Sequence, residues 1–344
     1  MAELRIYGAG VFGLSIAWEA TRRGASVEVV DPYGIGAGSS GGLVGALAPH
    51  VPDDWTAKKQ VQFDALEMAD GFWASVAMAG GVDPGYARTG RLQPVIDETG
   101  LALARQRGAT ARDLWQGRYD WSLVPVTDFP GLLDSPTGWL VHDTLTARLH
   151  PRRACAALAA AITVQGGRIG VAASDRAATE VWATGVAGLN DLSRDLGRAV
   201  GNGVKGQAAL LRADLRTAPQ LFAEALHIVP HADGTVAIGS TSERYYDAAD
   251  TTDAQLDALI ATARRLCPAL QDAALLDRWA GLRPRTLSRA PMLGAHPTRP
   301  GAYVANGGFK IGFGMAPMVA RLMTDLVLEG RDAIPDSFRV AANL

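Results

Sequence analysis

The first two dozen residues of this 344-residue chain contain a glycine-rich loop between a strand and a helix. Residues 4–7 (LRIY) form a short apolar run that is typical of a buried strand. Gly8, Gly10 and Gly13 follow at once in the pattern G-x-G-x-x-G. Apolar residues then recur at helical spacing until two arginines and a glycine at 22–24 end the helix. A strand, loop and helix in this order are the setting in which the motif binds a dinucleotide.

A second strand and an acidic residue complete the motif. Residues 26–30 (SVEVV) predict a strand, and Asp31 follows it directly. This position is close to the spacing of about 20 residues at which a carboxylate binds a ribose hydroxyl. The first two glycines allow a tight turn beside a pyrophosphate, and the third lets the helix pack closely on the strand. Glycines that serve only as turn residues are the weaker interpretation, because every neighbouring element is in place. The motif alone leaves NAD and FAD open.

Composition disfavours several other classes of protein. The length suggests two domains at about 150 residues each, and 48% hydrophobic with only 20% charged residues argues against disorder. A net charge of −2 without a basic block disfavours a nucleic-acid partner. Cys155 and Cys267 lack metal-ligand spacing, so we expect no metal site. Because we find neither an apolar run of about 18 residues nor a signal peptide, we expect a cytoplasmic protein.

The segment at residues 34–50 (GIGAGSSGGLVGALAPH) favours FAD over NAD. A nicotinamide-dependent dehydrogenase normally continues here with another strand and helix, whereas this chain has small residues and the hydroxyls of Ser39 and Ser40. The segment resembles the D-amino-acid oxidase superfamily of flavoproteins, and the glycine oxidases most closely. In that family it runs past the flavin pyrophosphate and then under the isoalloxazine ring.

Six further segments carry the same resemblance along nearly the whole chain, in the order in which the family has them. They are LHPRR at 149–153, EVWATG at 180–185, VKGQ at 204–207, the hairpin IVP…IGSTSE at 228–243, WAGLRP at 279–284 and NGGFKIG at 306–312. The chain is therefore identified as a member of this superfamily.

The resemblance implies an α/β fold with two interleaved domains. One is an FAD-binding Rossmann-like domain of the glutathione-reductase type, and the other is an α+β substrate domain built on an antiparallel sheet. We expect the FAD-binding domain at residues 1–50, 140–200 and 275–330. The substrate domain then takes 51–139 and 201–274, and 331–344 form a C-terminal tail.

The chain departs from the family pattern at two places. Only about ten residues (170–179) stand where the family has a longer antiparallel excursion, which leaves the adenine side of the cofactor less covered. Near the C-terminus, Gly308-Phe309-Lys310 resembles the monomeric sarcosine oxidases more than the glycine oxidases. In those oxidases the lysine binds the substrate carboxylate. The reaction class stays the same, but the identity of the substrate is left open.

The motifs and the resemblance together assign residues to the cofactor. The candidate FAD-binding residues are Gly8, Gly10, Val11, Phe12, Gly13, Asp31, Ser39, Ser40, Gly45, Ala46, Leu47, Thr184, Gly185, Gly308, Phe309, Lys310, Ile311 and Gly312. We find no cysteine near residues 281–283 and no histidine within 34–49, where covalent attachment would be expected. The sequence therefore predicts non-covalent FAD.

Amine oxidation by a flavin needs little acid–base chemistry from the protein. A hydride equivalent moves from the carbon that bears the nitrogen to flavin N5, and the lone pair of a neutral amine drives it. An amino-acid substrate does require a cation for its carboxylate. Arg283 is the first candidate, because a guanidinium binds a carboxylate in bidentate fashion. By resemblance, Lys310 lies over the flavin, and Tyr246 or its neighbour Tyr245 covers the substrate. A surface arginine, a solvated lysine and a packed tyrosine are the structural alternatives.

The sequence thus predicts an FAD-dependent oxidase or dehydrogenase of a small amine or amino acid of the glycine, sarcosine or D-amino-acid type. The product is an imine that hydrolyses, and oxygen is the expected electron acceptor. Two alternatives stay open: an oxidase that acts on a carboxymethylamino group of a modified tRNA base, and a non-catalytic FAD-binding module. The oligomeric state is not predicted.

Overall fold

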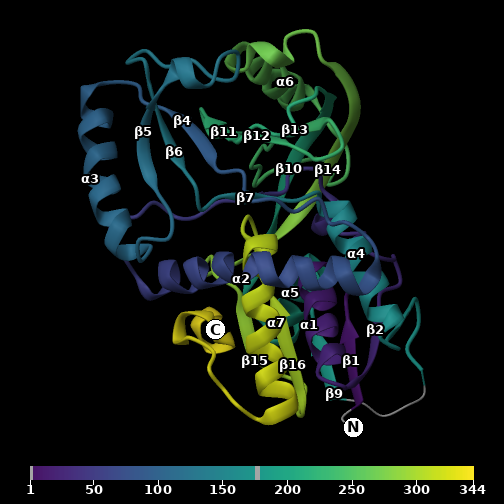
Figure 1. The fold of residues 1–344 in the computed structure, drawn as a ribbon. Coiled ribbons are helices and arrows are strands. Elements are labelled where there is room, and N and C mark those ends of the chain that lie inside the picture. The colour runs from purple at the N-terminus through teal and green to yellow at the C-terminus, as the bar shows by residue number, and fades with distance from the viewer. Residues whose placement is uncertain (1–2, 175–178) are drawn as a thin grey trace.

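The computed structural model describes residues 3–174 and 179–344 and contains two large sheets, one in each lobe of the molecule (Figure 1). The lower lobe in this view holds a six-stranded, mainly parallel sheet, and the upper lobe holds an eight-stranded, mainly antiparallel sheet. A short pair, β3 (Ala46–Leu47) and β7 (Ala147–Arg148), forms a third sheet. The α/β fold predicted from the sequence, with a Rossmann-like part and an antiparallel-sheet part, is confirmed.

The six-stranded sheet begins with the predicted strand, helix and strand. Its strands lie in the order β15 (Met292–Ala295), β16 (Ala302–Asn306), β9 (Thr179–Trp182), β1 (Glu3–Tyr7), β2 (Ser26–Val30) and β8 (Arg168–Gly170). All neighbours pair in parallel except β15 with β16. The loop after β1 leads directly into α1 (Val11–Arg22), as the glycine pattern predicts.

Helices cover both faces of this sheet. Leu4 and Ile6 of β1 are buried toward α1, which packs against α4 (Pro151–Val164) and α7 (Gly312–Glu329). On the other face α5 (Gly185–Asp195) buries Leu189 and Leu192 against Val304 of β16. Because side chains alternate along a strand, one sheet can supply two separate cores.

The eight-stranded sheet spans most of the other lobe. Its order is β14 (Ala274–Thr286), β10 (Gly201–Arg212), β13 (Thr235–Gly239), β12 (Leu226–Pro230), β11 (Gln220–Ala223), β4 (Arg91–Pro94), β6 (Trp139–Asp143) and β5 (Trp121–Pro125). Among the described strands of this eight-stranded sheet, only β11 and β4 pair in parallel. The predicted hairpin is confirmed as β12 and β13, with Gly234 at a positive φ of 82° in the turn. The helix α6 (Ala254–Leu266) packs on β10, β12 and β13, and α3 (Glu98–Leu114) packs on β5.

Three elements lie elsewhere than the proposed domain division expects. Strands β6 and β14 fall within the segments 140–200 and 275–330, or at their edges, yet both belong to the eight-stranded sheet. The long α2 (Ala57–Gly80), expected in the substrate domain, packs against α4 and α7. Burial of its residues Phe63, Leu66 and Trp73 in the core of the lower lobe explains this position. The division therefore stays a proposal, with these elements crossing between its two parts.

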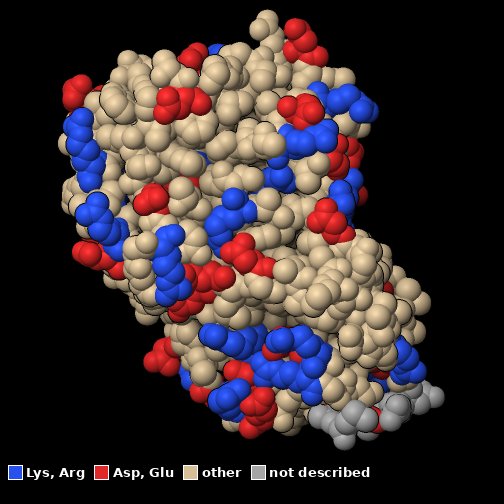
Figure 2. Space-filling view, viewed as in Figure 1, with Lys and Arg blue, Asp and Glu red and all other residues tan. Residues whose placement is uncertain are grey.

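Charged side chains of both signs are mixed on the molecular surface. Figure 2 shows basic and acidic side chains interspersed on the viewed face, with a mixed group over the region of α1 and α7. Arg23, at the end of α1, pairs with Glu19, Asp325 and Glu329, at 2.6–2.8 Å.

Within the described residues, the helices are too short or too polar to cross a membrane. The shortened segment runs from β8 to β9, and its residues 175–178 lie outside the described part of the chain.

Candidate active site

The glycine loop is shaped by two close approaches of backbone to backbone. A Cβ added to Gly13 would lie 1.9 Å from the carbonyl oxygen of Gly8, so only glycine lets α1 start this near β1. A Cβ on Gly8 would lie 2.4 Å from the oxygen of Ala183, which follows β9. Gly8 also has a positive φ of 107°, which disfavours any other residue. The loop is thus confined between α1 and the segment that leads into α5.

The N-terminus of α1 presents backbone amides that the helix cannot satisfy. The first amide to donate to a carbonyl of the helix is that of Leu14, to Gly10 (2.9 Å). The Val11 amide donates to Ser40 Oγ at 3.0 Å, and the amides of Phe12 and Gly13 have no earlier turn to donate to. With the positive end of the helix dipole, such amides form an anion site that fits a pyrophosphate.

Asp31 braces the same loop. Its Oδ2 accepts a hydrogen bond from the Ala9 amide at 2.8 Å, and its Oδ1 accepts one from the Tyr33 amide at 3.0 Å. Each carboxylate oxygen can accept a further hydrogen bond. The carboxylate is therefore fixed beside the loop and remains able to bind a hydroxyl.

The start of α7 lies beside the start of α1. A Cβ on Gly308 would lie 3.1 Å both from the ring of Phe12 and from Gly312, so glycine at this position allows the contact. A Cβ on Gly312 would lie 3.6 Å from Val11. The first turn of α7 contains no acidic residue and no side-chain cap. The N-termini of α1 and α7 therefore lie next to each other, and each presents its backbone amides there.

The remaining candidate cofactor residues surround these two helix starts. Ser39 and Ser40 form a 3-10 turn, and β3 with Ala46 and Leu47 packs near α7. Gly45 precedes β3, where a Cβ would lie 1.8 Å from the Leu149 oxygen. The structure thus gathers the residues predicted for the cofactor, including Thr184, Gly185, Phe309 and Ile311 in the adjoining loops. Their roles as ligands remain predictions.

Arg283 is a buried cation with part of its hydrogen-bonding capacity unused. It lies on β14 with 8% of its surface exposed. Its Nη2 donates to Ser240 Oγ (2.6 Å) and to the Thr241 carbonyl (3.1 Å), whereas its Nη1 is buried and has no partner among the described residues. Burial lowers its pKa to about 10, against the opposing effect of Glu243. A Cβ on Gly206 would lie 1.6 Å from Nη2, so the glycine leaves room for the guanidinium.

Lys310 approaches this arginine from the loop before α7. Its pKa is lowered, first by burial and then by the charge of Arg283, which brings the two cations into one electrostatic environment. Its Nζ lies 5.7 Å from the centroid of the Phe309 ring. The Phe309 amide donates to the carbonyl of Pro284 at 3.1 Å, so the loop that carries Lys310 runs beside the strand that carries Arg283.

The position of the predicted tyrosine relative to Arg283 and Lys310 is less well defined by contacts. Tyr246 is half-buried in the irregular segment after β13, and its neighbour Tyr245 is 93% exposed. Among the described residues, no hydrogen bond or ring contact joins Tyr246 to Arg283 or Lys310, so its role stays a prediction.

Three residues that the sequence reasoning missed lie near Lys310 on one face of the eight-stranded sheet. The rings of Phe222 and His227 lie with their centroids 4.5 Å apart and their planes tilted by 42°. The Arg91 guanidinium lies 5.8 Å from the Phe222 centroid, and its Nε donates to Asp143 (2.8 Å). Burial lowers the pKa of His227 to about 3, helped by the charges of Arg91 and Lys310, so this imidazole is neutral at neutral pH. Its Nδ1 is buried without a partner in the described chain.

A sequence signal for His227 existed. Leu226 and Ile228 on either side of it are buried in the outer core of the sheet. Alternation along a strand then turns His227 to the opposite face.

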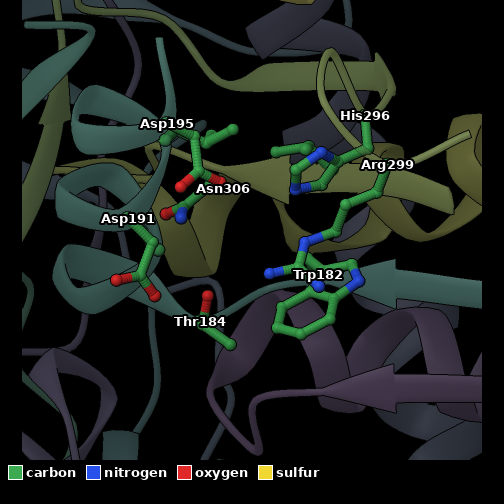
Figure 3. A pocket seen from close by; sticks show the side chains of 10 residues that line it. Trp182, Thr184, Asp191, Asp195, His296, Arg299 and Asn306 are labelled. Atoms are coloured by element: carbon green, nitrogen blue, oxygen red, sulfur yellow. The ribbon is translucent and has the colours of Figure 1, made fainter. Parts of the chain in front are cut away.

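A separate surface pocket lies between α5, the end of β9, β16 and the loop that joins β15 to β16 (Figure 3). Arg299 lies over the ring of Trp182 at 4.1 Å, across the pocket from Asp191 and Asp195. Its lining includes Thr184 but neither Arg283 nor Lys310. The pocket is therefore distinct from the candidate substrate-binding pair, although it shares Thr184 with the candidate cofactor residues.

Comparison with known proteins identifies the family. Residues 5–326 match the DAO family, described as FAD dependent oxidoreductase. The chain is 31% identical to the glycine oxidase of Pseudomonas putida, over 97% of this chain and 96% of that protein. It is 28% identical to the bifunctional protein ThiO/ThiG of Nostoc sp., over 95% of this chain and 53% of that protein.

Solved structures share the fold. The glycine oxidase of Geobacillus kaustophilus superposes with a TM-score of 0.82 at 21% identity, over 99% of both chains. The iminodiacetate oxidase of Chelativorans sp. BNC1 gives a TM-score of 0.82 at 19% identity, over 98% of both chains. The matched family agrees with the glycine loop, the open amides of α1 and the fixed carboxylate of Asp31, and the chain belongs to the DAO family of FAD-dependent oxidoreductases.

Proposed function

We propose that the chain oxidises a small amine or amino acid of the glycine, sarcosine or D-amino-acid type. The observation that carries this proposal is the buried guanidinium of Arg283, whose Nη1 lacks a partner among the described residues and which lies close to Lys310. Glu243 offsets the cost of burying this cation only in part, since the pKa of Arg283 stays lowered, and a substrate carboxylate would supply a further counter-charge. The glycine oxidase relatives support the same substrate class.

Arg283 orients the substrate. Its Nη2 is held by Ser240 and Thr241, so the planar guanidinium is fixed and Nη1 is left to donate to a carboxylate oxygen. Fixing a reactant by its carboxylate places the carbon next to it in one position, which is the entropic part of catalysis.

Lys310 and the N-terminus of α7 supply positive charge on the other side of the site. Because the first turn of α7 carries no acidic residue, the partial charge of its amides is not neutralised there. These groups stabilise negative charge on bound carboxylate or cofactor. The open amides of α1 would hold the pyrophosphate, and Asp31 would hold the ribose.

When bound, FAD accepts the hydride equivalent from the carbon that bears the nitrogen, which leaves an imine that water hydrolyses. Phe222 and the neutral His227 border the same site near Lys310 and exclude water from part of it. The unpartnered Nδ1 of His227 offers a hydrogen bond to the substrate amine or carboxylate.

An anaerobic substrate panel tests the proposal. Glycine, sarcosine, D-alanine, D-proline and a simple N-alkyl amine are mixed with the holoprotein, and the visible absorbance of the oxidised flavin is followed. Bleaching by an amino acid, with return of the colour on admission of air, supports the proposal and oxygen as acceptor. If every amine leaves the flavin oxidised, the chain does not have this activity.

A further inference from the structure

Four cations lie beside the candidate active site, and within residues 3–174 and 179–344 they have no acidic partner. Lys58 comes from α2, Arg244 from the segment after β13, Arg285 from β14 and Arg289 from the loop after β14. We call them the outer cation group. Lys58 and Arg285 are half-buried, and Arg244 and Arg289 are exposed. Three segments that are far apart in sequence thus bring positive charge to one region.

The outer cation group is held together against mutual repulsion. The Lys58 Nζ donates to the backbone carbonyl of Arg289 at 2.8 Å, so one cation is tied to the residue that carries another. The pKa of Lys58 is lowered by burial and then by Arg289, and that of Arg285 by burial and then by Arg289 and Arg244. Among the described residues, none of the four forms an ion pair with a carboxylate, whereas most other arginines near the molecular surface do.

The group adjoins the inner pair, Arg283 and Lys310. Arg283 and Arg285 are two residues apart on β14, so their side chains leave the same face of the strand and their backbones lie about 7 Å apart. The Arg285 guanidinium lies 6.0 Å from the centroid of the Phe309 ring, and Lys310 Nζ lies 5.7 Å from the same centroid. Phe309 therefore contacts one member of each set. A small molecule with two acidic groups can reach both.

We propose that the outer cation group binds a second acidic group of the substrate, so that the preferred substrates are amino acids that carry an additional carboxylate or phosphonate. This inference rests on the proposed function, because it assigns the first carboxylate to Arg283. The half-buried Arg285, held against an aromatic ring, is the member best placed to bind in bidentate fashion. The exposed Arg244 and Arg289 add charge at the rim.

The test compares two substrates that differ only in the second acid. Sarcosine carries a methyl group on nitrogen where iminodiacetate carries a carboxymethyl group. We expect kcat/KM for iminodiacetate to exceed that for sarcosine in the parent holoenzyme. In Arg285→Gln the ratio of the two values falls by about tenfold, which corresponds to one charge-assisted contact of ~1.4 kcal/mol. Arg285→Lys restores part of the ratio.

Matched controls separate a local site from general electrostatics. Arg105 on α3 is an exposed arginine with no acidic partner in the described part of the chain, and Arg105→Gln removes the same charge far from the site. We expect Arg105→Gln to leave the ratio unchanged. Sarcosine is also assayed with added acetate, which supplies a free anion. If the outer group takes only free anions, acetate changes the rate with sarcosine and iminodiacetate has no advantage, which overturns the proposal. An equal loss in Arg285→Gln and Arg105→Gln also overturns it.

A binding experiment keeps the inference separate from the proposed function. Malonate and acetate carry two carboxylates and one, respectively, and neither is an amine. Their affinities for the holoprotein are read from the shift of the flavin spectrum. If no amine bleaches the flavin but malonate binds more tightly than acetate only when Arg285 is present, the outer site stands and the proposed activity falls. Equal affinities in the parent and in Arg285→Gln contradict the outer site whatever the activity.

Discussion

Arg283 combines burial with an unused donor, and this combination makes it sensitive to substitution. Removing one partner of a buried charge pair costs about 2–5 kcal/mol, or a loss of roughly 30-fold to several thousand-fold in kcat/KM. We expect Arg283→Ala to show a loss in this range on an amino acid. Arg283→Lys loses less, because it keeps the charge but not the two-pronged geometry.

The measurement is steady-state kinetics with glycine, sarcosine and a simple N-alkyl amine, with flavin content as the control for folding. The amine has no carboxylate, so its oxidation should change little. Wild-type efficiency of Arg283→Ala on every amino acid that the parent oxidises would contradict a role in carboxylate binding.

Gly206 offers an indirect test of the same guanidinium. A Cβ in Gly206→Ala would lie 1.6 Å from Arg283 Nη2 and must displace it. We expect a higher KM for amino acids with FAD retained. Gly71→Ala is the matched control, because a Cβ there meets nothing within 4 Å and alanine favours the α2 helix. Equal KM values for the two variants would show that the position of Arg283 is unimportant.

At the residue scale, the sequence could supply only those site residues that stand in recognisable motifs. Arg283 and Lys310 were found in this way, and the structure places them close together. His227 and Phe222 were not found, because their meeting depends on the pairing of β11 with β12 and on which sheet face turns toward Lys310. Local sequence does not encode such a tertiary relation.

At the element scale, Asp31 links the end of β2 to the loop that opens α1. Asp31→Ala removes acceptors from the Ala9 and Tyr33 amides and from the predicted ribose hydroxyl. Loss of hydrogen bonds to a charged group costs about 1.5–3 kcal/mol, so FAD should bind about 10-fold to 150-fold more weakly. Asp31→Asn, which keeps one acceptor oxygen, should fall between. The dissociation constant is obtained by titrating apoprotein with FAD, and circular dichroism checks that the fold persists. An unchanged constant in Asp31→Ala would remove Asp31 from the cofactor site.

Elements with strong local signals were predicted well. The strand, helix and strand at the N-terminus have nearly the predicted bounds, because glycines and apolar periodicity set them. The sheet to which β14 belongs and the lobe in which α2 packs were not predictable from such local signals. The 13 residues of β14 pair with β10 along its whole length, and α2 buries its apolar side against α4 and α7. Both outcomes depend on partners distant in sequence.

At the scale of the whole molecule, the state of the cofactor can be tested directly. Both cysteines are buried, and burial raises the pKa of Cys155 to about 12, so its thiol is a poor nucleophile at neutral pH. We expect acid precipitation of the purified holoprotein to release intact FAD into the supernatant. Flavin that stays with the pellet would contradict non-covalent binding.

Stability toward acid should depend on a histidine pair that joins the two lobes. His150 precedes α4 of the lower lobe, and His231 follows β12 of the upper lobe, with ring centroids 4.6 Å apart. Burial lowers the pKa of both, that of His231 to about 3, and the charges of Arg148 and Arg153 add to the effect on His231 while Asp233 opposes it. Between the ordinary value of 6.5 and about 3, the unfolded chain binds protons that the folded chain does not. The contribution of this histidine to the free energy of unfolding is therefore fully present above that range, and it is lost as the pH drops through the range.

We expect the melting temperature to fall from about pH 7.5 to about pH 5, and to fall less in His231→Gln, which cannot bind this proton. His296→Gln serves as the comparison, because His296 is only partly buried and lies on the far side of the six-stranded sheet from α1. Each variant is judged by its change between the two pH values, so a constant loss of stability from the substitution cancels. If His231→Gln shows the same change as the parent protein, protonation of this junction does not limit stability in this pH range, and another buried histidine with a lowered pKa, such as His227, must account for the loss.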